Sequence, residues 1–283
     1  MHRLCFVGML LLFLCLSTHA QINGANCGTD GTTNVTTDGT NAAEDGTSAC
    51  DDPVATGLTP GELAMYMPAP DKHVHWGALM RESFLYLVVQ QGFRAGTQPY
   101  TVDRMKGPWF ENWFRSVESL HGWSDGDGFF TTYMSHPFQG AAYNYMWQQN
   151  DPSCKFTTYR NEKHYWNCKF KGLAFSAASE IQWALGPISE ASIGNTQLHH
   201  PPGVVDLFTT PFGGFGLVVA EDALDQKVIR RFEMRVHNPF LRAWVRTIPE
   251  PGHSIANMLR LKYPWYRDDR GGVRDVRADA ARE

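Results

Sequence analysis

No long segment of this sequence alternates apolar and polar residues, as a strand with one buried face would. Its apolar residues instead recur at helical spacing, and Gly-Pro pairs at 107–108 and 186–187 interrupt or end the helical pattern. We therefore predict an all-α fold, a compact bundle of about six to eight helices. The expected helical segments are 71–93, 103–123, 131–151, 171–186, 204–236, 238–248 and 252–261.

The two ends of the chain differ in composition from the part that is expected to fold. Residues 1–20 combine a basic start, an apolar stretch and a small-residue end, which is typical of a secretory signal peptide. Residues 21–60 consist mainly of Gly, Thr, Asn, Asp and Ala, so we expect a flexible, low-complexity linker. Residues 267–283 hold five Arg, five acids and few apolar residues, which predicts a solvated, flexible tail. The helical domain should therefore span 61–266.

Four cysteines remain after removal of the signal peptide: Cys27, Cys50, Cys154 and Cys168. An even number in an exported protein indicates two disulfides, for which three pairings exist. Closeness in sequence favours Cys27–Cys50 and Cys154–Cys168. A metal site is the alternative for the second pair, although the usual C-x₂-C spacing is absent.

Charge and aromatic content restrict the class of partner. The net charge of −4 and the lack of a basic stripe argue against nucleic acid. No internal apolar run is long enough to span a membrane. Aromatic residues make up 13% of the chain, which suits a large core and also a surface that contacts lipid. Such a surface would serve as an interface or as a membrane-facing belt.

Two glutamates stand in a region that is otherwise apolar. The residues just before Glu180 carry no charge, and Glu190 follows beyond a Gly-Pro pair. Burying an unpaired carboxylate costs on the order of several kcal/mol, so each glutamate needs a partner or must face water. Other helical segments offer partners: His136 and Gln139 lie three apart on one face, and Asp206 precedes a Thr-Thr-Pro-Phe-Gly-Gly turn.

A structural interpretation explains these residues without any catalytic or ligand-binding role. Asp206 would cap a helix, His136 would bond to backbone at a helix entry, and Glu180 and Glu190 would pair with Arg or Lys. Three further acids would form a solvated face near Lys227 and Arg230. They are Glu221, Asp222 and Asp225.

A functional interpretation gathers histidines and carboxylates from facing helices into one site, as helical bundles do when they bind metals or activate water. The catalytic candidates are Glu180, Glu190, His136 and Asp206. The ligand-binding candidates are His75, Gln139, Thr210 and Gly214. No motif identifies a cofactor or a metal: H-E-x-x-H and G-x-S-x-G are absent, and "DGDG" at 125–128 departs from a calcium loop and predicts a turn.

Three stretches, "YMSHPFQGAAYNYMW", "SEIQWALGPISEASIGN" and "VVDLFTTPFGG", resemble a family of bacterial envelope proteins of unknown function. The resemblance covers roughly residues 70–265 and implies an exported protein of the periplasm or outer envelope, with no assigned chemistry. The matching positions are His136, Gln139, Glu180, Glu190, Asp206, Thr210 and Gly214.

A weaker likeness is to VanZ-like helical proteins, in which an Asp-Lys-x-x-His start precedes a Glu-x-x-Gln helix. "DKHVH" matches that start and places His75 at the histidine, whereas Gln182 follows Glu180 by two positions and not three. VanZ-like proteins span the membrane, and this chain is more polar.

Two functions remain open from the sequence. The first is a binding or structural module of the bacterial envelope, whose aromatic helices contact lipid or an outer-membrane partner. The second is an envelope-directed hydrolase, in which Glu180 or Glu190 is the base and His136 and His75 act as acid or metal ligand.

Overall fold

The computed structural model describes residues 73–97, 99–193 and 203–273, which belong to the compact unit Pro70–Glu283. These residues form eight helical stretches and no strand, which confirms the predicted all-α bundle. The predicted signal peptide at 1–20, the linker at 21–60 and the Cys27–Cys50 pair lie outside the described residues.

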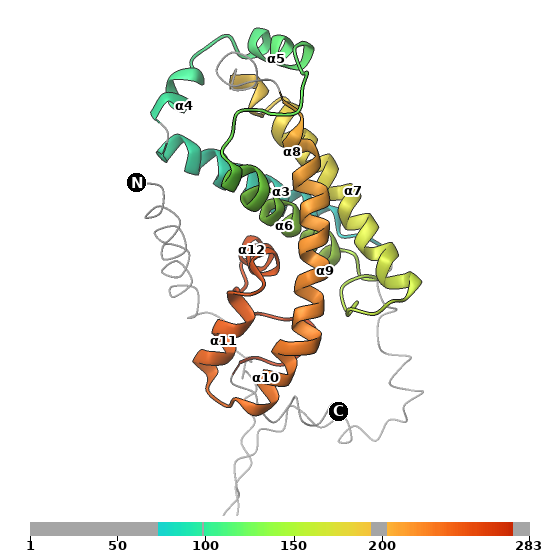
Figure 1. Ribbon diagram of the computed structural model, residues 1–283. Coiled ribbons are helices and arrows are strands. Elements are labelled where there is room, and N and C mark those ends of the chain that lie inside the picture. The colour runs from blue at the N-terminus through green and yellow to red at the C-terminus, as the bar shows by residue number, and fades with distance from the viewer. Residues whose placement is uncertain (1–72, 98, 194–202, 274–283) are drawn as a thin grey trace, which may run out of the picture. The chain divides into compact units, whose positions relative to one another are not determined.

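Figure 1 shows the helices in chain order. The first half contains α3 (Trp76–Thr97), α4 (Pro99–Arg104), α5 (Trp109–Glu118), the π-helical turn η2 (Thr131–Ser135), α6 (His136–Asn150), α7 (Lys163–Leu185) and the 3-10 turn η3 (Ala191–Ile193). One long helical stretch follows, built from α8 (Val205–Phe208), the π-helical turn η4 (Thr209–Gly213), α9 (Gly214–Leu224), the π-helical turn η5 (Asp225–Ile229) and α10 (Arg230–Arg235). The last helices are α11 (Pro239–Thr247) and α12 (Pro251–Leu259).

Helix α6 is the centre of the bundle, because it packs against α3, α7, α9 and α12. Its sequence contains no Asp, Glu, Lys or Arg, and most of its side chains are buried. The burial of its apolar side chains, among them Tyr143, Tyr145 and Met146, is the main force that holds the surrounding helices to it. The core around α6 comprises Leu79, Tyr86, Ala141, Ala142, Tyr143, Tyr145, Met146, Val218, Ala256 and Leu259.

Two glycines set the closest approach in the bundle. A Cβ at Gly140 of α6 would overlap the carbonyl oxygen of Thr210, and a Cβ at Gly214 would overlap the backbone at Gly140. The backbones of α6 and the η4–α9 junction therefore touch, which only residues without a side chain allow. Gly214, expected to bind a ligand, serves this packing.

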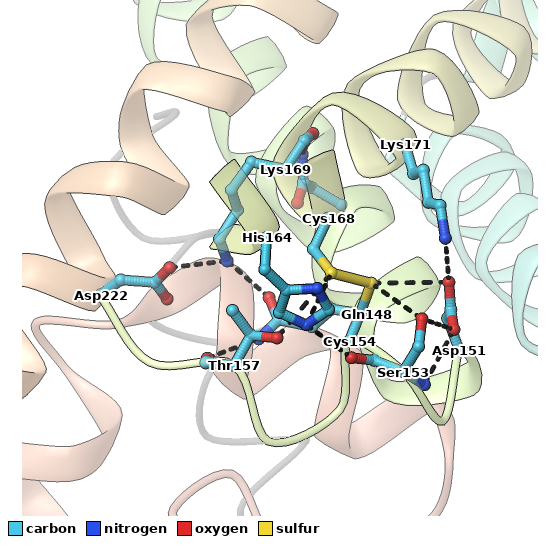
Figure 2. Close-up of a disulfide and its surroundings, with 11 residues drawn as sticks. Gln148, Asp151, Ser153, Cys154, Thr157, His164, Cys168, Lys169, Lys171 and Asp222 are labelled. Carbon is cyan, nitrogen blue, oxygen red and sulfur yellow. Dashed lines mark hydrogen bonds and ion pairs between the residues drawn. A yellow bond between two sulfur atoms is a disulfide. The ribbon is translucent and has the colours of Figure 1, made fainter. Parts of the chain in front are cut away.

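The connection between α6 and α7 is closed by the Cys154–Cys168 disulfide, as predicted. Figure 2 shows the surroundings of this bond, where the Lys171 ammonium group of α7 donates a hydrogen bond to the Asp151 carboxylate. The Asp151 carboxylate also accepts from the Ser153 backbone and hydroxyl, so the start of the loop is tied to the end of α6.

A buried lysine links three helices next to the disulfide. Lys169 of α7 lies 2.6 Å from the Asp222 carboxylate of α9 and donates to Gln148 of α6 (Figure 2). The hydroxyls of Tyr145 and Tyr165 donate to the same carboxylate at 2.9 Å. A buried charge pair is tolerated when its remaining hydrogen-bonding capacity is used, as it is here.

The predicted tail begins too early. Arg267 is buried and pairs with Glu250, and its guanidinium also donates to the carbonyls of Pro264 and Tyr266. Arg270 pairs with Asp225. Charged composition predicted a solvated segment, but the four charged residues at 267–270 each pair with an opposite charge on the folded domain.

The predicted solvated face on α9 is also wrong. Glu221 is buried and accepts from the backbone of Gly252 and His253 at the start of α12. Asp222 and Asp225 pair with cations from α7 and from the C-terminal segment. These acids lie close together in sequence, and segments distant in sequence cover them in space.

The Gly140→Ala substitution should lower the free energy of unfolding by about 1–3 kcal/mol, because the added methyl group forces two helix backbones apart. The matched control is Gly92→Ala in α3, where a Cβ would meet nothing within 4 Å. The control should be more stable than the parent by about 0.5–1 kcal/mol. Urea unfolding measures both, and equal effects of the two substitutions would contradict the close crossing.

Burial raises the pKa of Glu221 to about 8, against the lowering effect of the Gly252 hydrogen bond. The folded state therefore holds this proton more tightly than the unfolded state. The tighter binding of this proton stabilises the folded state fully below about pH 4.5, and this contribution is lost as the pH rises toward 8. Glu221→Gln cannot ionise, so its stability relative to the parent should rise by on the order of 1–4 kcal/mol between pH 4.5 and 8.

Melting temperatures across this pH range measure the difference between the two proteins. Glu111→Gln is the matched control, because Glu111 is an exposed acid that pairs with Arg115 within α5. A stability difference between Glu221→Gln and the parent that stays constant with pH would show that Glu221 titrates normally.

Candidate functional site

The structure brings five of the predicted site residues together at the start of α6. The ring of His136 lies between Thr210 of η4 and Asp206 of α8: Nδ1 is 3.0 Å from the Thr210 hydroxyl, and Nε2 is 3.0 Å from Asp206 Oδ2. Glu180 of α7 approaches from the interior, with Oε1 4.0 Å from His136 Nδ1. Gln139 donates to the other oxygen of Glu180 at 3.1 Å.

Two of the three helical stretches that carry this cluster change to π-helical geometry beside it. The turn η2 ends just before His136, and η4 contains Thr210. Pro137 and Pro211 lie at these two places, and a proline cannot donate the backbone hydrogen bond that an α-helix requires. Such local π-helical turns are frequent at functional sites, where they reposition side chains.

Glu180, like Thr210, is fully buried, with 0% of its surface exposed. Its Oε1 atom has no hydrogen-bond partner among the described residues. Burial raises the pKa of Glu180 to about 7; the charge of His136 opposes this change and the charge of Asp206 adds to it. The carboxyl group therefore gains or loses its proton near neutral pH.

His136 lies between opposing influences. Burial would lower its pKa, but the hydrogen bond to Asp206 and the charges of Glu180 and Asp206 outweigh it and raise the pKa above the ordinary value. His136 and Asp206 keep contact with solvent, since 10% and 19% of their side-chain surfaces are exposed. They form the outer end of a polar chain that begins at Glu180.

Sequence analysis missed two acids at this outer end. Asp125 shares a hydrogen bond with Asp206, and burial, that bond and the neighbouring charge raise the pKa of Asp125 to about 6. Asp127 has a carboxylate oxygen within 4.8 Å of ligand atoms of His136 and Asp206. Both belong to the segment that was interpreted only as a turn.

The turn itself is firmly attached to the start of α8. The backbone of Val204 donates to Gly122 at 3.3 Å, and that of Val205 donates to Trp123 at 3.0 Å. A Cβ at Gly203 would overlap the backbone of Ser124, so the glycine permits this contact. In the sequence, the two Asp were visible but nothing connected them to Asp206.

Two predicted site residues lie elsewhere. Glu190 forms an ion pair with Arg94 of α3 and takes no part in the His136 cluster, as the structural interpretation expected. The backbone of His75 donates to Asn150, at the opposite end of α6 from His136. The length of α6 separates these two positions by about 20 Å, so His75 is not part of the cluster.

The capping role considered for Asp206 is not observed, because α8 has no side-chain cap and the Asp206 carboxylate faces His136. The backbone bond considered for His136 is replaced by its contacts with Thr210 and Asp206.

An open apolar groove with a volume of about 300 Å³ is lined by residues that neighbour the cluster residues in the sequence. Pro137 follows His136, and Thr209 precedes Thr210. Large exposed side chains surround it. The groove is lined by Tyr133, Pro137, Phe208, Thr209, Phe212 and Gly213, and the neighbouring exposed side chains include Trp123, Phe129, Phe130 and Met134.

The chain matches no protein-family model, no curated protein and no solved structure. The resemblances drawn from short motifs therefore stay predictions. Among the described residues, no helix is both long and apolar enough to cross a membrane.

Thr210→Val should lower the free energy of unfolding by about 1–3 kcal/mol, because it keeps the shape but leaves the buried Nδ1 of His136 without its hydroxyl partner. Thr97→Val is the control, since the Thr97 hydroxyl is exposed and bonds only within α3. Chemical unfolding compares the two. A loss no larger than that of the control would show that Thr210 does not hold the histidine.

Proposed function

We propose that the chain is an exported hydrolase of the bacterial envelope that cleaves an ester bond in an amphiphilic, lipid-like substrate. The observation that carries the proposal is the His136–Asp206 pair, which reaches solvent beside an apolar groove. The apolar leader of the sequence and the Cys154–Cys168 disulfide support export, because disulfides persist in oxidising compartments.

In the proposed reaction, Asp206 acts as general base and His136 orients it, because the contacts with Asp206 and Thr210 occupy both ring nitrogens of the histidine. The Asp206 carboxylate removes a proton from a water molecule, and the resulting hydroxide attacks the ester carbonyl. The bond between the acyl carbon and the leaving oxygen then breaks, and the Asp206 carboxyl group returns its proton to that oxygen. Thr210 holds the other ring nitrogen in place.

A direct attack by Thr210 is excluded by its burial. The geometry resembles a hydroxyl–histidine–carboxylate triad, but Thr210 is 0% exposed and its hydroxyl faces the interior. A nucleophile must reach the reacting carbon. Water is therefore the nucleophile in the proposed mechanism.

The groove supplies the substrate preference. Each methylene group that leaves water contributes about 0.8 kcal/mol, so a longer acyl chain should bind more tightly in the groove. Phe208 and Phe212 stack along one side of it at a centroid distance of 6.4 Å. The scissile bond would then lie at the end of the groove next to His136.

The test uses fluorogenic umbelliferyl esters of acetate, butyrate and octanoate. We expect kcat/KM to increase with chain length, and His136→Gln and Asp206→Asn to lower it at least 100-fold. The matched controls, His164→Gln and Asp103→Asn, should retain full activity. Phe212→Ser should reduce the preference for octanoate over acetate without a comparable loss on acetate. Hydrolysis by the parent that survives His136→Gln would contradict the proposal.

A second candidate function, binding to an anionic membrane surface, is favoured by the α10–α11 hairpin. Phe240 and Trp244 of α11 are 69% and 57% exposed. Between residues 226 and 249 the single acid is Glu233, which is buried and paired with Arg246. The exposed cations Lys227, Arg231 and Arg235 are therefore not offset by an exposed acid within this segment.

Basic side chains beside exposed aromatic ones are typical of helices that lie on anionic bilayers. The parent protein should sediment with phosphatidylglycerol-containing vesicles and not with pure phosphatidylcholine vesicles. The Arg231→Glu/Arg235→Glu and Phe240→Ser/Trp244→Ser variants should lose most of this binding, whereas Phe110→Ser on α5 should not. Equal binding to both vesicle types would contradict a role for the basic side chains in membrane binding.

A further inference from the structure

We propose that Asp127, His136 and Asp206 bind one divalent transition-metal ion at the outer end of the polar cluster. One ligand atom from each residue lies within 4.8 Å of the other two. The residues come from three segments: the turn before α6, the start of α6 and α8. No local sequence motif produces this arrangement, and only the fold assembles it.

The distance between the ligand atoms of His136 and Asp206 is already suitable for binding one ion. Two ligand atoms that lie about 2.1 Å from an octahedral ion, at right angles to each other, are separated by roughly 3.0 Å. His136 Nε2 and Asp206 Oδ2 are 3.0 Å apart. Asp127 is exposed, so its carboxylate can close on an ion without repacking of the core.

A buried, unpartnered oxygen behind the histidine is an independent indication of a ligand. Glu180 is 0% exposed, and its Oε1 atom points at His136 Nδ1 from 4.0 Å without a hydrogen-bond partner among the described residues. A histidine that binds a metal through one nitrogen usually donates its other N–H to a carboxylate or another oxygen. Glu180 and Thr210 offer both kinds of oxygen on the inner side of the ring.

The crowding of carboxylates at the rim also favours a bound cation. Asp125, Asp127 and Asp206 gather at the rim with Glu180 behind them, and within residues 73–97, 99–193 and 203–273 no Lys or Arg forms an ion pair with any of the four. Carboxylates that crowd in this way repel one another unless they bind protons or a metal. A divalent ion would neutralise them together.

The donor set restricts the kind of ion. Imidazole nitrogen with carboxylate oxygen suits Zn²⁺ or Mn²⁺ better than Ca²⁺ or Mg²⁺, which prefer oxygen alone. Three protein ligands leave at least one position open for water or substrate, as in catalytic metal sites. The role of the ion in catalysis rests on the proposed hydrolase. In that reaction the ion would polarise the ester carbonyl, and its positive charge would let the acidic rim accept an anionic head group of the substrate.

The experiment is a titration of the full chain, stripped with a chelator, with ZnCl₂ by calorimetry and with MnCl₂ by electron paramagnetic resonance. We expect one ion per chain. Asp127→Asn, His136→Gln and Asp206→Asn should each weaken binding more than tenfold, and Glu180→Gln should weaken it about tenfold through the histidine. Asp103→Asn and His164→Gln are the controls and should bind as the parent does.

Asp127→Asn is the decisive variant, because Asp127 is exposed and its loss should leave folding intact, which circular dichroism verifies. Absence of binding by the parent, or binding that Asp127→Asn leaves unchanged, would overturn the inference. The two proposals fail separately: stoichiometric binding without ester hydrolysis would refute only the hydrolase, and hydrolysis by a parent chain that binds neither ion would refute only the metal site.

Discussion

The close crossing of α6 with the η4–α9 junction is the constraint on which the rest of the site depends. Gly140 and Gly214 allow two backbones to touch, and this contact carries His136 to the side of Thr210 and Asp206. A side chain at either glycine would overlap the facing backbone and force the helices apart. The side-chain contacts of the site therefore depend on this close packing of the two backbones.

The helices around this crossing are joined by polar groups to an unusual extent. Lys169 with Asp222, Arg246 with Glu233 and Arg267 with Glu250 are all buried or nearly so. Each of these cations has an acid in contact, and removal of one partner would leave a buried charge alone. The His136 cluster differs, since it gathers carboxylates around one histidine and leaves an oxygen of Glu180 unpartnered. The three ion pairs therefore form a structural network, whereas the His136 cluster has an oxygen atom that is still able to accept a hydrogen bond.

Several features followed from local sequence. Helical periodicity and Gly-Pro breaks predicted most of the helices, although α4 was missed and α7 begins at Lys163 and not at 171. The short separation predicted Cys154–Cys168, and the apolar context of Glu180 indicated that it needs a partner. Glu190 shared that context and belongs to an ion pair with Arg94 instead. Local sequence cannot distinguish these cases, because the partner of a buried carboxylate comes from a distant segment.

The helical fold and the need of certain polar residues for partners can be read from the sequence, because both depend on residue spacing and on the cost of burial. Which residues meet depends on how the helices pack. The tertiary structure placed the Asp125–Asp127 turn against α8, moved His75 to the far end of α6, and folded residues 267–270 onto the acids of α9. The physical reason is that contacts between distant segments depend on how helix surfaces fit together, which no local pattern in the sequence records.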